Sequence, residues 1–406
     1  MKFRVEHDAL ADVVAWVARA LPSRPVVPVL AGLRLEAGDG LTLSCFDYDL
    51  AATARVEADV AEPGTALVPG RLLAEITRSL PGQPAEFAAD GDVVSLTCGS
   101  AEFALVSLPL ADYPQLPRTP PVAGTIDGGE LAAAVAQVLP AASRDDTLPM
   151  LTAVCLDIRG ESMMLAATDR YRLAVRELRW EPAEPGLRAI ALVPARTLAD
   201  AARTMAPGEP VPVAFTPADA PAADRDPHPV EGMISFDSRG RRLTGRLIGG
   251  EFIRYRSRFP DGYSCRAEMP AGPFIEAVRR VSLVADRVSP VRLTFGQGQV
   301  VVEAQTEGRA RAAEAVTASF EGDERTIAFN PHYLLDGLTA AAAPGSARPP
   351  ADPDGASDPA AAAAIRLEFT SPAKPALITP VGDDGGEGAD PSFRYLVVPL
   401  RSPTRA

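Results

Sequence analysis

Apolar and polar positions follow the same order at three places along the chain. The segments ALVPGRLLAEITRSL (66–80), ALVPARTLADAARTM (191–205) and IAFNPHYLLDGLTAA (327–341) each begin with a short apolar run and continue with apolar residues at helical spacing. A proline separates the two parts of each segment, at Pro69, Pro194 and Pro331. Proline is favoured in the first turn of a helix, because its missing N–H would have no partner there. Each segment therefore predicts a strand followed by a helix that begins at the proline.

A second helical pattern precedes each of these segments, and alternating strands follow it. The helical patterns lie in 3–21, 125–139 and 268–287. Asp8, Glu130 and Glu276 are predicted near the starts of these helices, where the helix dipole favours acidic side chains. Alternation of apolar and polar residues then runs through 33–58, 154–178 and 291–316, and the turns AGDG, RGES and GQGQ within them predict β-hairpins.

One unit of helix, strands, helix and strands thus occurs three times, which predicts an α+β fold of three repeated domains. We place the domains at 1–121, 122–264 and 265–406, because the boundaries fall in Pro-rich or turn-rich sequence. Three segments rich in Pro, Gly, Ala and Asp interrupt this plan, at 216–229, 340–364 and 382–392. Their composition cannot form a core, so they are predicted to be loops.

Composition and charge exclude several classes of protein. The 406 residues are 47% hydrophobic and carry a net charge of −13, and Arg supplies all the basic residues except Lys2 and Lys374. An acidic chain can still present a local basic surface, because the distribution of charge matters more than its sum. The N-terminus lacks the apolar core of a signal peptide and no apolar run is long enough to span a bilayer, so we expect a cytoplasmic protein.

The residues that carry catalysis or hold metals do not form a known pattern. Four cysteines, Cys45, Cys98, Cys155 and Cys265, are scattered without a CxxC pair, which predicts free thiols. The three histidines, His7, His228 and His332, are far apart, and no HExxH, GxSxG, Walker A or GxGxxG motif is present. The sequence predicts neither a cofactor nor a metal site and favours a protein that is not an enzyme.

The stretch ATDRYRLAVREL (167–178) places charged residues in the middle of an Ala- and Leu-rich region. From the residues alone it is typical of an ordinary amphipathic strand. Several other segments give it a more specific meaning: MKFRVE at the start, SRPVVPVLAGLRLE (23–36), FALVSLPLADYPQLP (103–117), TLPMLTAV (147–154) and YLVVPLR (395–401). With these segments in order and at matching positions of the repeat, the chain resembles the bacterial β sliding clamp, the processivity subunit (β subunit) of DNA polymerase III. The Arg-rich TDRYR is similar to actinobacterial members.

The resemblance implies a fold and a function. Family members have three clamp domains per chain, with helices inside and antiparallel sheets outside, and two chains form a six-domain ring as a homodimer. The ring encircles double-stranded DNA and slides along it. It tethers the DNA polymerase III α subunit, the clamp loader and other proteins through short peptides, which bind in a pocket between the second and third domains.

Positions that match the family's motifs give the expected site residues. The partner-peptide pocket is expected to contain Leu151, Thr168, Arg170, Tyr171, Arg172, Leu173, Ile253, Arg258, Val397, Val398, Pro399, Leu400 and Arg401, with aliphatic groups inside and an arginine rim. Arg24 matches a DNA-contacting position, and Arg19, Arg71, Arg78, Arg196, Arg203, Arg279 and Arg280 are expected on the inner helices. The dimer interface is expected at Phe103 and Leu105 of one chain and near Leu283 of the other.

The sequence departs from the family pattern at the pocket. Ile253 and Arg258 stand where the family usually offers Pro and a small aliphatic residue, and Ser402 replaces a Leu. A cation in an apolar pocket is costly unless it reaches water or a partner. This departure keeps a second hypothesis open, a diverged clamp paralogue that acts as a protein-interaction scaffold or as an inhibitor-resistant copy. An enzyme hidden on an α+β scaffold is a third possibility, although no cluster of metal-type carboxylates favours it.

Overall fold

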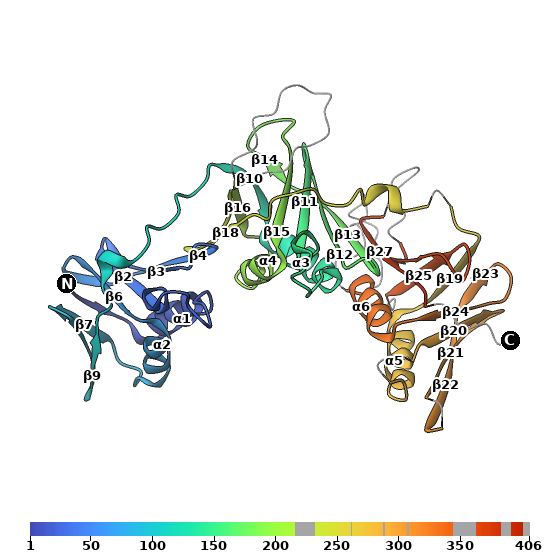
Figure 1. Ribbon diagram of the computed structural model, residues 1–406, viewed down its shortest axis with the longest axis horizontal. Coiled ribbons are helices and arrows are strands. Elements are labelled where there is room, and N and C mark those ends of the chain that lie inside the picture. The colour runs from blue at the N-terminus through green and yellow to red at the C-terminus, as the bar shows by residue number, and fades with distance from the viewer. Residues whose placement is uncertain are drawn as a thin grey trace.

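The computed structural model describes residues 1–215, 232–260, 262–286, 289–306, 308–343, 363–382 and 391–400. We keep the three proposed domains under the names unit 1 (1–121), unit 2 (122–264) and unit 3 (265–406). The units follow one another along an arc, with the helices on its concave side and the sheets on its outer side (Figure 1). The predicted loops at 216–229 and most of those at 340–364 and 382–392 lie outside the described residues.

Each unit contains two helices and nine strands in the same order within the described residues, so strand n of unit 1 corresponds to strand n+9 of unit 2 and n+18 of unit 3. Unit 1 has α1 (His7–Ala18), α2 (Gly70–Ser79), β1 (Lys2–Val5), β2 (Gly32–Gly38), β3 (Gly40–Phe46), β4 (Leu50–Val56), β5 (Asp59–Glu62), β6 (Gly64–Pro69), β7 (Ala85–Asp90), β8 (Val93–Cys98) and β9 (Ala101–Val106).

Unit 2 repeats this order from its first strand. Its elements are α3 (Gly128–Val138), α4 (Ala195–Ala202), β10 (Val122–Asp127), β11 (Ala153–Arg159), β12 (Ser162–Thr168), β13 (Arg172–Arg179), β14 (Glu181–Pro182), β15 (Arg188–Pro194), β16 (Pro210–Phe215), β17 (Met233–Ser238) and β18 (Arg241–Arg246).

Unit 3 repeats the order once more. Its elements are α5 (Ala271–Ser282), α6 (Pro331–Ala341), β19 (Cys265–Pro270), β20 (Val291–Gly296), β21 (Gln299–Thr306), β22 (Ala310–Thr317), β23 (Ser319–Glu321), β24 (Arg325–Phe329), β25 (Ala364–Phe369), β26 (Ala376–Pro380) and β27 (Phe393–Val397). Among the described residues no helix has both the length and the apolar character that a bilayer crossing requires.

The three predicted hairpins are present, but two details of the helix starts were wrong. β2 pairs with β3, β11 with β12 and β20 with β21, each antiparallel around the predicted turn. Pro69 and Pro194 close the preceding strands and are N-cap residues, so only Pro331 lies in the first turn of its helix. Glu276 lies in the middle of α5, where it pairs with Arg279, because that helix begins at Ala271.

Strand pairing joins the units into continuous sheets. β4 of unit 1 pairs antiparallel with β18 of unit 2, which makes a nine-stranded sheet in the order β14-β10-β16-β17-β18-β4-β3-β2-β6. β13 of unit 2 pairs with β27 of unit 3 in a second nine-stranded sheet, β15-β11-β12-β13-β27-β26-β25-β19-β23. We call these two contacts joint 1–2 and joint 2–3.

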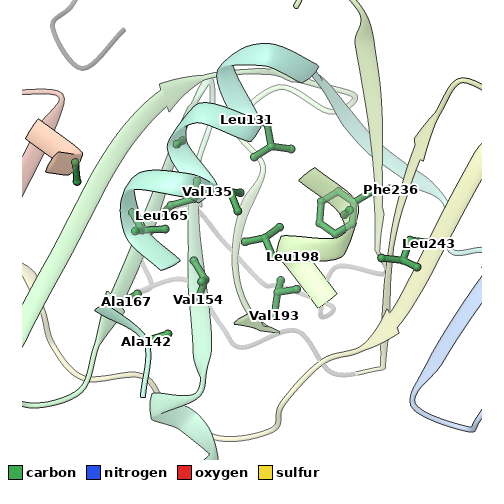
Figure 2. Packing of buried hydrophobic residues seen from close by; sticks show 14 of the residues in the cluster. Leu131, Val135, Ala142, Val154, Leu165, Ala167, Val193, Leu198, Phe236 and Leu243 are labelled. Atoms are coloured by element: carbon green, nitrogen blue, oxygen red, sulfur yellow. The ribbon is translucent and has the colours of Figure 1, made fainter. Parts of the chain in front are cut away.

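One buried apolar cluster runs through all three units between the helices and the sheets. In unit 2, Leu131 and Val135 of α3 and Leu198 of α4 pack onto the inner face of the strands, as Figure 2 shows. The outer face of the sheet that contains β11 to β13 and β27 carries a second, smaller cluster that includes Leu173 and Leu396. It is covered by Ile248, Phe252, Ile253, Phe259 and Tyr263. Strand β11 is therefore buried on both faces, whereas β2 of unit 1 alternates between buried and less buried positions.

Candidate functional site

The structure brings the two main parts of the predicted peptide pocket together at joint 2–3. Thr168 to Leu173 come from the end of β12 and the start of β13, and Val397 and Val398 come from the end of β27. Antiparallel pairing sets Arg172 opposite Val397. The N–H of Val398 then donates to the carbonyl oxygen of Tyr171 at 2.8 Å. Residues 225 positions apart in the sequence thus form one continuous wall.

The segment Asp169–Tyr171 is the turn between β12 and β13, so the prediction of an uninterrupted strand through ATDRYRL was wrong. One oxygen of Asp169 accepts hydrogen bonds from the backbone N–H groups of Tyr171 (3.0 Å) and Arg172 (3.1 Å). The hydroxyl of Thr168 donates to the carbonyl of Arg172 and accepts from the N–H of Arg170. Arg170 adopts a left-handed backbone with φ of 80°. Short polar side chains that bond to nearby backbone favour a turn over a strand.

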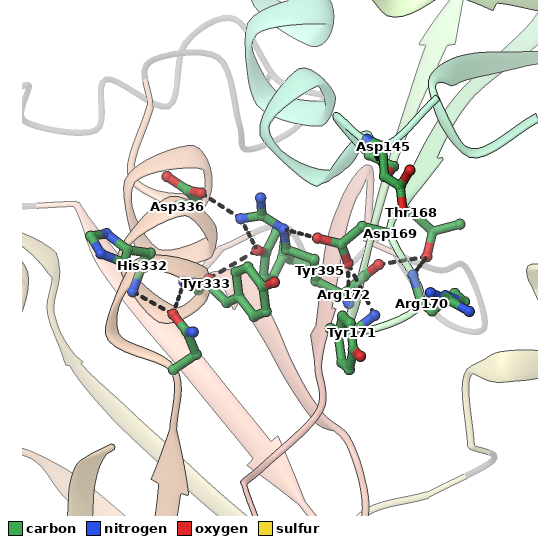
Figure 3. Close-up of polar contacts among 12 residues, drawn as sticks. Asp145, Thr168, Asp169, Arg170, Tyr171, Arg172, His332, Tyr333, Asp336 and Tyr395 are labelled. Carbon is green, nitrogen blue, oxygen red and sulfur yellow. Dashed lines mark hydrogen bonds and ion pairs between the residues drawn. The ribbon is translucent and has the colours of Figure 1, made fainter. Parts of the chain in front are cut away.

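Arg172 does not belong to an exposed arginine rim, because its side chain is only 10% exposed. Its Nε donates to Asp169 of the same turn at 3.0 Å, and its Nη1 pairs with Asp336 of α6. The guanidinium lies 4.4 Å from the ring centre of Tyr333, and its Nη1 is 3.4 Å from the hydroxyl of Tyr395 (Figure 3). This correction follows from burial at the joint, where an arginine requires partners for its charge.

The neighbours of Arg172 stabilise its positive charge. Burial by itself disfavours the cation, but the nearby Tyr395 hydroxyl, the hydrogen bond to Asp336 and the charge of Asp169 outweigh burial and raise the pKa of Arg172. Burial raises the pKa of Tyr395, whose hydroxyl donates to the carbonyl of Tyr333 at 2.9 Å. Arg172 is therefore a well-stabilised cation within this network.

The apolar surface beside this network is partly exposed. Tyr171 is 53% exposed and stacks on Tyr333 with ring centres 6.1 Å apart. Val398 and Leu400 are 37% and 39% exposed, while Leu151, Thr168, Leu173 and Val397 are buried and Pro399 is buried beside them. The N–H of Leu400 donates to the carbonyl of Ala328, which fixes the tail of β27 on unit 3. Arg401 and Ser402 lie outside the described residues.

The segment that connects units 2 and 3 is anchored by a buried carboxylate. Asp157 in β11 is 3% exposed and accepts hydrogen bonds from the hydroxyl of Tyr255 (2.8 Å), from Arg256 (2.9 Å) and from Arg159 (3.1 Å). Burial by itself would raise the pKa of Asp157, but these three donors outweigh burial and hold the pKa below its usual range. The anchor fixes the backbone that carries Ile253 and Arg258.

Ile253 and Arg258 lie in different environments within this segment. Ile253 is half-buried and packs against the outer cluster that contains Leu173 and Leu396. Arg258 is exposed at the end of a short 3-10 turn (Arg256–Arg258), so its guanidinium remains in water. The predicted cost of a buried cation at this position therefore does not arise in the free protein.

Several residues of this site were missed by the sequence analysis. Tyr333, Asp336 and Tyr395 were assigned only to a helix and a strand, and nothing in the sequence places them next to Arg172. Asp157 had a recognisable signal, since it interrupts the apolar strand VCLDI, where an unpaired carboxylate would be costly.

The predicted DNA-facing arginines are all exposed, and most of them lie on or beside the helices of the concave side. Four of them pair with nearby carboxylates. Arg196 and Arg203 pair with Asp200 at 4.0 and 2.7 Å, Arg279 pairs with Glu276 at 2.6 Å, and Arg280 pairs with Glu314 of β22 at 2.6 Å. Arg71 donates to the carbonyl of Pro22 at 3.2 Å, and Arg24, Arg78 and Arg19 are exposed.

The predicted dimer residues lie at the two ends of the arc. Phe103 is half-buried on β9, the edge strand of unit 1, and Leu283 is 84% exposed just after α5. Leu105 is only 2% exposed, because its side chain packs into the core of unit 1. A contact with a partner chain at Leu105 would therefore involve its backbone.

Two cavities lie away from the predicted pocket. One of about 800 Å³ is lined by Asp127, Glu130, Arg179 and Trp180 among others, and one of about 510 Å³ surrounds Cys265 and Arg266. In the larger cavity Asp127 already accepts hydrogen bonds from the N–H groups of Glu130 and Gly208, as the cap of α3. Across the described part of the chain, no group of three His, Cys, Asp or Glu residues is arranged to hold a metal ion.

Comparison with known proteins gives a consistent result. Three family models of the DNA polymerase III beta subunit match this chain. The model of the N-terminal domain matches residues 1–117, that of the central domain residues 125–253 and that of the C-terminal domain residues 256–345. The beta sliding clamp of Streptomyces coelicolor is 46% identical over 402 residues, which cover 99% of each chain. The beta sliding clamp homolog GriR of Streptomyces muensis is 40% identical over 403 residues, again 99% of each chain.

A solved structure agrees with the fold. The crystal structure of the DNA polymerase sliding clamp of Bacillus subtilis superposes with a TM-score of 0.84 at 24% identity and covers 99% of this chain and all of its own. With the three domain models and the whole-length relatives, the chain belongs to the family of bacterial DNA polymerase III beta subunits, the beta sliding clamps.

Proposed function

We propose that two copies of the chain form a closed six-domain ring that encircles double-stranded DNA and confers processivity on DNA polymerase III. The observation that carries this proposal is an incomplete third joint. Each internal joint makes a nine-stranded sheet. At the two ends of the arc, unit 1 has a separate five-stranded sheet and unit 3 has a separate four-stranded sheet. Among the described residues, β9 and β22 are edge strands with no neighbour on one side. β9 corresponds to β18 and β27, and β22 corresponds to β4 and β13, all four of which are paired at the internal joints. A second copy placed head to tail supplies the missing halves.

The internal joints predict the register of the third one. In joint 1–2 Ala52 is opposite Leu243, and in joint 2–3 the corresponding Ala174 is opposite Tyr395. The same positions in the free edges are Ala312 and Phe103. Across the internal joints, the backbone N–H of Arg246 donates to the carbonyl oxygen of Asp49 and that of Val398 donates to the carbonyl oxygen of Tyr171, both at 2.8 Å. The corresponding bond in the dimer runs from Val106 to the carbonyl of Arg309 of the partner subunit.

The exposed arginines on the concave side support weak contact with DNA phosphates. Because four of them pair with carboxylates, each exchanges one partner for another when it meets a phosphate, and the net gain is small. Topological retention then holds the ring on DNA, while weak, sequence-independent contacts allow sliding. The chain acts by binding and requires no catalytic group or cofactor.

The site at joint 2–3 is proposed to bind peptides of the DNA polymerase III α subunit, the clamp loader and other DNA-processing proteins. Leu151, Thr168, Arg170, Leu173, Ile253, Arg258 and the residues Val397 to Arg401 are its proposed members, with Tyr171 and Tyr333 at its edge. Partly exposed apolar side chains next to fixed polar groups are typical of a surface that binds a short peptide.

A retention experiment tests the proposal. The protein is placed on nicked circular DNA and on the same DNA after linearisation, with a clamp loader, and both are filtered at high salt. A ring stays on the circle and slides off the linear molecule. Equal loss from both, together with a mass of one chain at all concentrations by light scattering, would contradict the ring.

A second candidate function rests on Arg258. An exposed arginine at a position that the family pattern assigns to the peptide site favours a diverged clamp. The site of such a clamp excludes ligands that other clamps bind, either as a scaffold or as an inhibitor-resistant copy. This hypothesis keeps the ring and changes only the peptide site, so peptide affinity distinguishes the two.

A further inference from the structure

We propose that Arg172 is a positioning residue that fixes unit 3 against unit 2 and so holds the two walls of the peptide site together, without contacting the peptide itself. This inference deepens the proposed peptide-binding function and rests on it. It concerns the network that Figure 3 shows around the start of β13.

The partners of Arg172 lie on both sides of the joint. Asp169 belongs to unit 2, whereas Asp336, Tyr333 and Tyr395 belong to unit 3. Its Nε and Nη1 are engaged by these groups, and one face of the guanidinium is covered by the Tyr333 ring. With a side chain that is 10% exposed, Arg172 offers little surface to a bound peptide.

The same residues shape the walls of the site. The turn that Asp169 and Thr168 organise carries Tyr171, whose ring stacks on Tyr333 and whose carbonyl accepts the N–H of Val398. A change in the position of α6 relative to β13 therefore moves Tyr171 and Val398 apart. A site that is held in its binding shape avoids the cost of being ordered when the ligand binds.

Comparison of the repeats shows that this network is not a general feature of the joints. The position of Arg172, two residues before Ala174, is Leu50 in unit 1 and Ala310 in unit 3. The sixth residue of α4, which corresponds to Asp336, is Asp200, and it pairs with arginines beside it on its own helix and at its end.

Tyr395 is also specific to joint 2–3. It stands where joint 1–2 has Leu243, and its hydroxyl reaches Arg172. Its ring packs directly over Gly337 of α6, where a Cβ would lie 2.4 Å from the ring. Of the two joints in the described part of the chain, only the one that carries the proposed peptide site has this network, which argues for a role in that site.

A double-mutant cycle tests the inference. The variants Arg172→Gln, Asp336→Asn and the double variant are compared with the wild type by fluorescence anisotropy, with a labelled peptide selected on the wild-type protein from a phage-displayed library. Leu151→Arg must abolish binding of this peptide, which places it at the site. Thr339→Ala, an exposed change on the same helix, is the matched control.

We expect each single variant to weaken peptide binding roughly tenfold. The double variant should bind the peptide as well as either single variant, because both substitutions disrupt the same interaction between Arg172 and Asp336. Direct contact by Arg172 predicts instead that Asp336→Asn binds like the wild type, which would overturn the inference. A wild-type protein that selects no peptide, or a peptide insensitive to Leu151→Arg, would contradict the proposed site rather than the role of Arg172.

An interdomain distance separates positioning from general destabilisation. The four native cysteines are buried, so spin labels can be placed at Arg179→Cys in unit 2 and Glu321→Cys in unit 3, with unlabelled chains in excess. Asp336→Asn is expected to broaden the distance distribution between the labels at temperatures where circular dichroism shows a folded protein. An unchanged distribution together with weakened peptide binding would overturn the inference.

Discussion

Joint 1–2 and joint 2–3 have the same backbone and different side chains. Both are antiparallel pairings in the same register, with Ala52 opposite Leu243 in one and Ala174 opposite Tyr395 in the other. Both end in the same 2.8 Å backbone hydrogen bond across the joint. The repeated fold therefore determines how units meet, and it does not determine what the joint can bind.

The difference lies in where each joint places its charges. In joint 1–2 Arg246 pairs with Asp49 on the surface, with side chains 58% and 79% exposed, and Arg241 pairs with Asp12 beside Trp16. Joint 2–3 encloses Arg172 and leaves Tyr171 and Val398 exposed instead. A few substitutions within one repeated frame thus turn a plain contact between units into a candidate binding site.

The largest expected effect tests whether the free edges form a third joint. Phe103→Arg places a cation where joint 1–2 has Leu243 and joint 2–3 has Tyr395. We expect the dimer to dissociate at concentrations where the wild type is dimeric, because the charge would be enclosed opposite Ala312 without a partner. Light scattering over a dilution series measures this. Thr97→Arg, on the exposed face of the neighbouring strand, should stay dimeric; a dimeric Phe103→Arg would contradict the proposed register.

A smaller effect is expected for Gly337→Ala. Helix propensity alone predicts a gain in stability for this change in α6. The added Cβ would instead lie 2.4 Å from the ring of Tyr395, and the fully buried ring has no room to move. We expect the free energy of unfolding to fall by about 2 kcal/mol, as for other overpacked cores. Chemical denaturation checks this against Thr339→Ala, and a stabilised Gly337→Ala would show that α6 is loosely packed against β27.

The sequence was sufficient to predict the three repeated units and insufficient to predict the network around Arg172. Proline positions and alternation predicted the three repeated units and their hairpins, because those signals are local. The turn at Asp169 was missed because apolar and polar residues continue to alternate through ATDRYRL. An Asp at the start of a turn is nonetheless a recognisable signal. Arg172, Asp336 and Tyr395 are far apart in the chain, so only the pairing of β13 with β27 shows that they meet.

The buried carboxylate behind joint 2–3 predicts a dependence on pH. Asp157→Asn should lower the free energy of unfolding by about 1–2 kcal/mol at pH 7, because the charged acceptor of three hydrogen bonds is lost. The pKa of Asp157 is lower in the folded protein than in the unfolded chain. Its contribution is therefore complete above the unfolded pKa of about 4 and is lost as the pH falls through the lower, folded value.

The measurement is the difference in stability between wild type and Asp157→Asn from pH 7 to pH 3. The difference should be constant down to about pH 5 and shrink below it. Glu161→Gln, a change at an exposed carboxylate, should give no such trend. A difference that stays constant to pH 3 would show that Asp157 is not the charged anchor of the connecting segment.

Arg258→Val tests whether the exposed arginine tunes the peptide site. We expect affinity for an apolar peptide to rise roughly fivefold, about 1 kcal/mol, because the guanidinium no longer loses part of its water when the peptide binds. Anisotropy titration measures this, with Arg254→Val, an exposed arginine of the same segment, as control. Unchanged affinity would remove the main support for a diverged, selective clamp.

The smallest effect is expected at the surface of joint 1–2. Arg246→Val gives this joint the aliphatic residue type that Val398 supplies in joint 2–3. Because the Arg246–Asp49 pair is largely exposed, the free energy of unfolding should change by less than about 0.5 kcal/mol. Calorimetric titration should still find one peptide per chain, since joint 1–2 lacks the enclosed arginine and the Tyr171–Tyr333 pair. A second peptide per chain would mean that this ion pair alone had kept joint 1–2 closed to peptides, and that the two joints differ by one side chain rather than by a network.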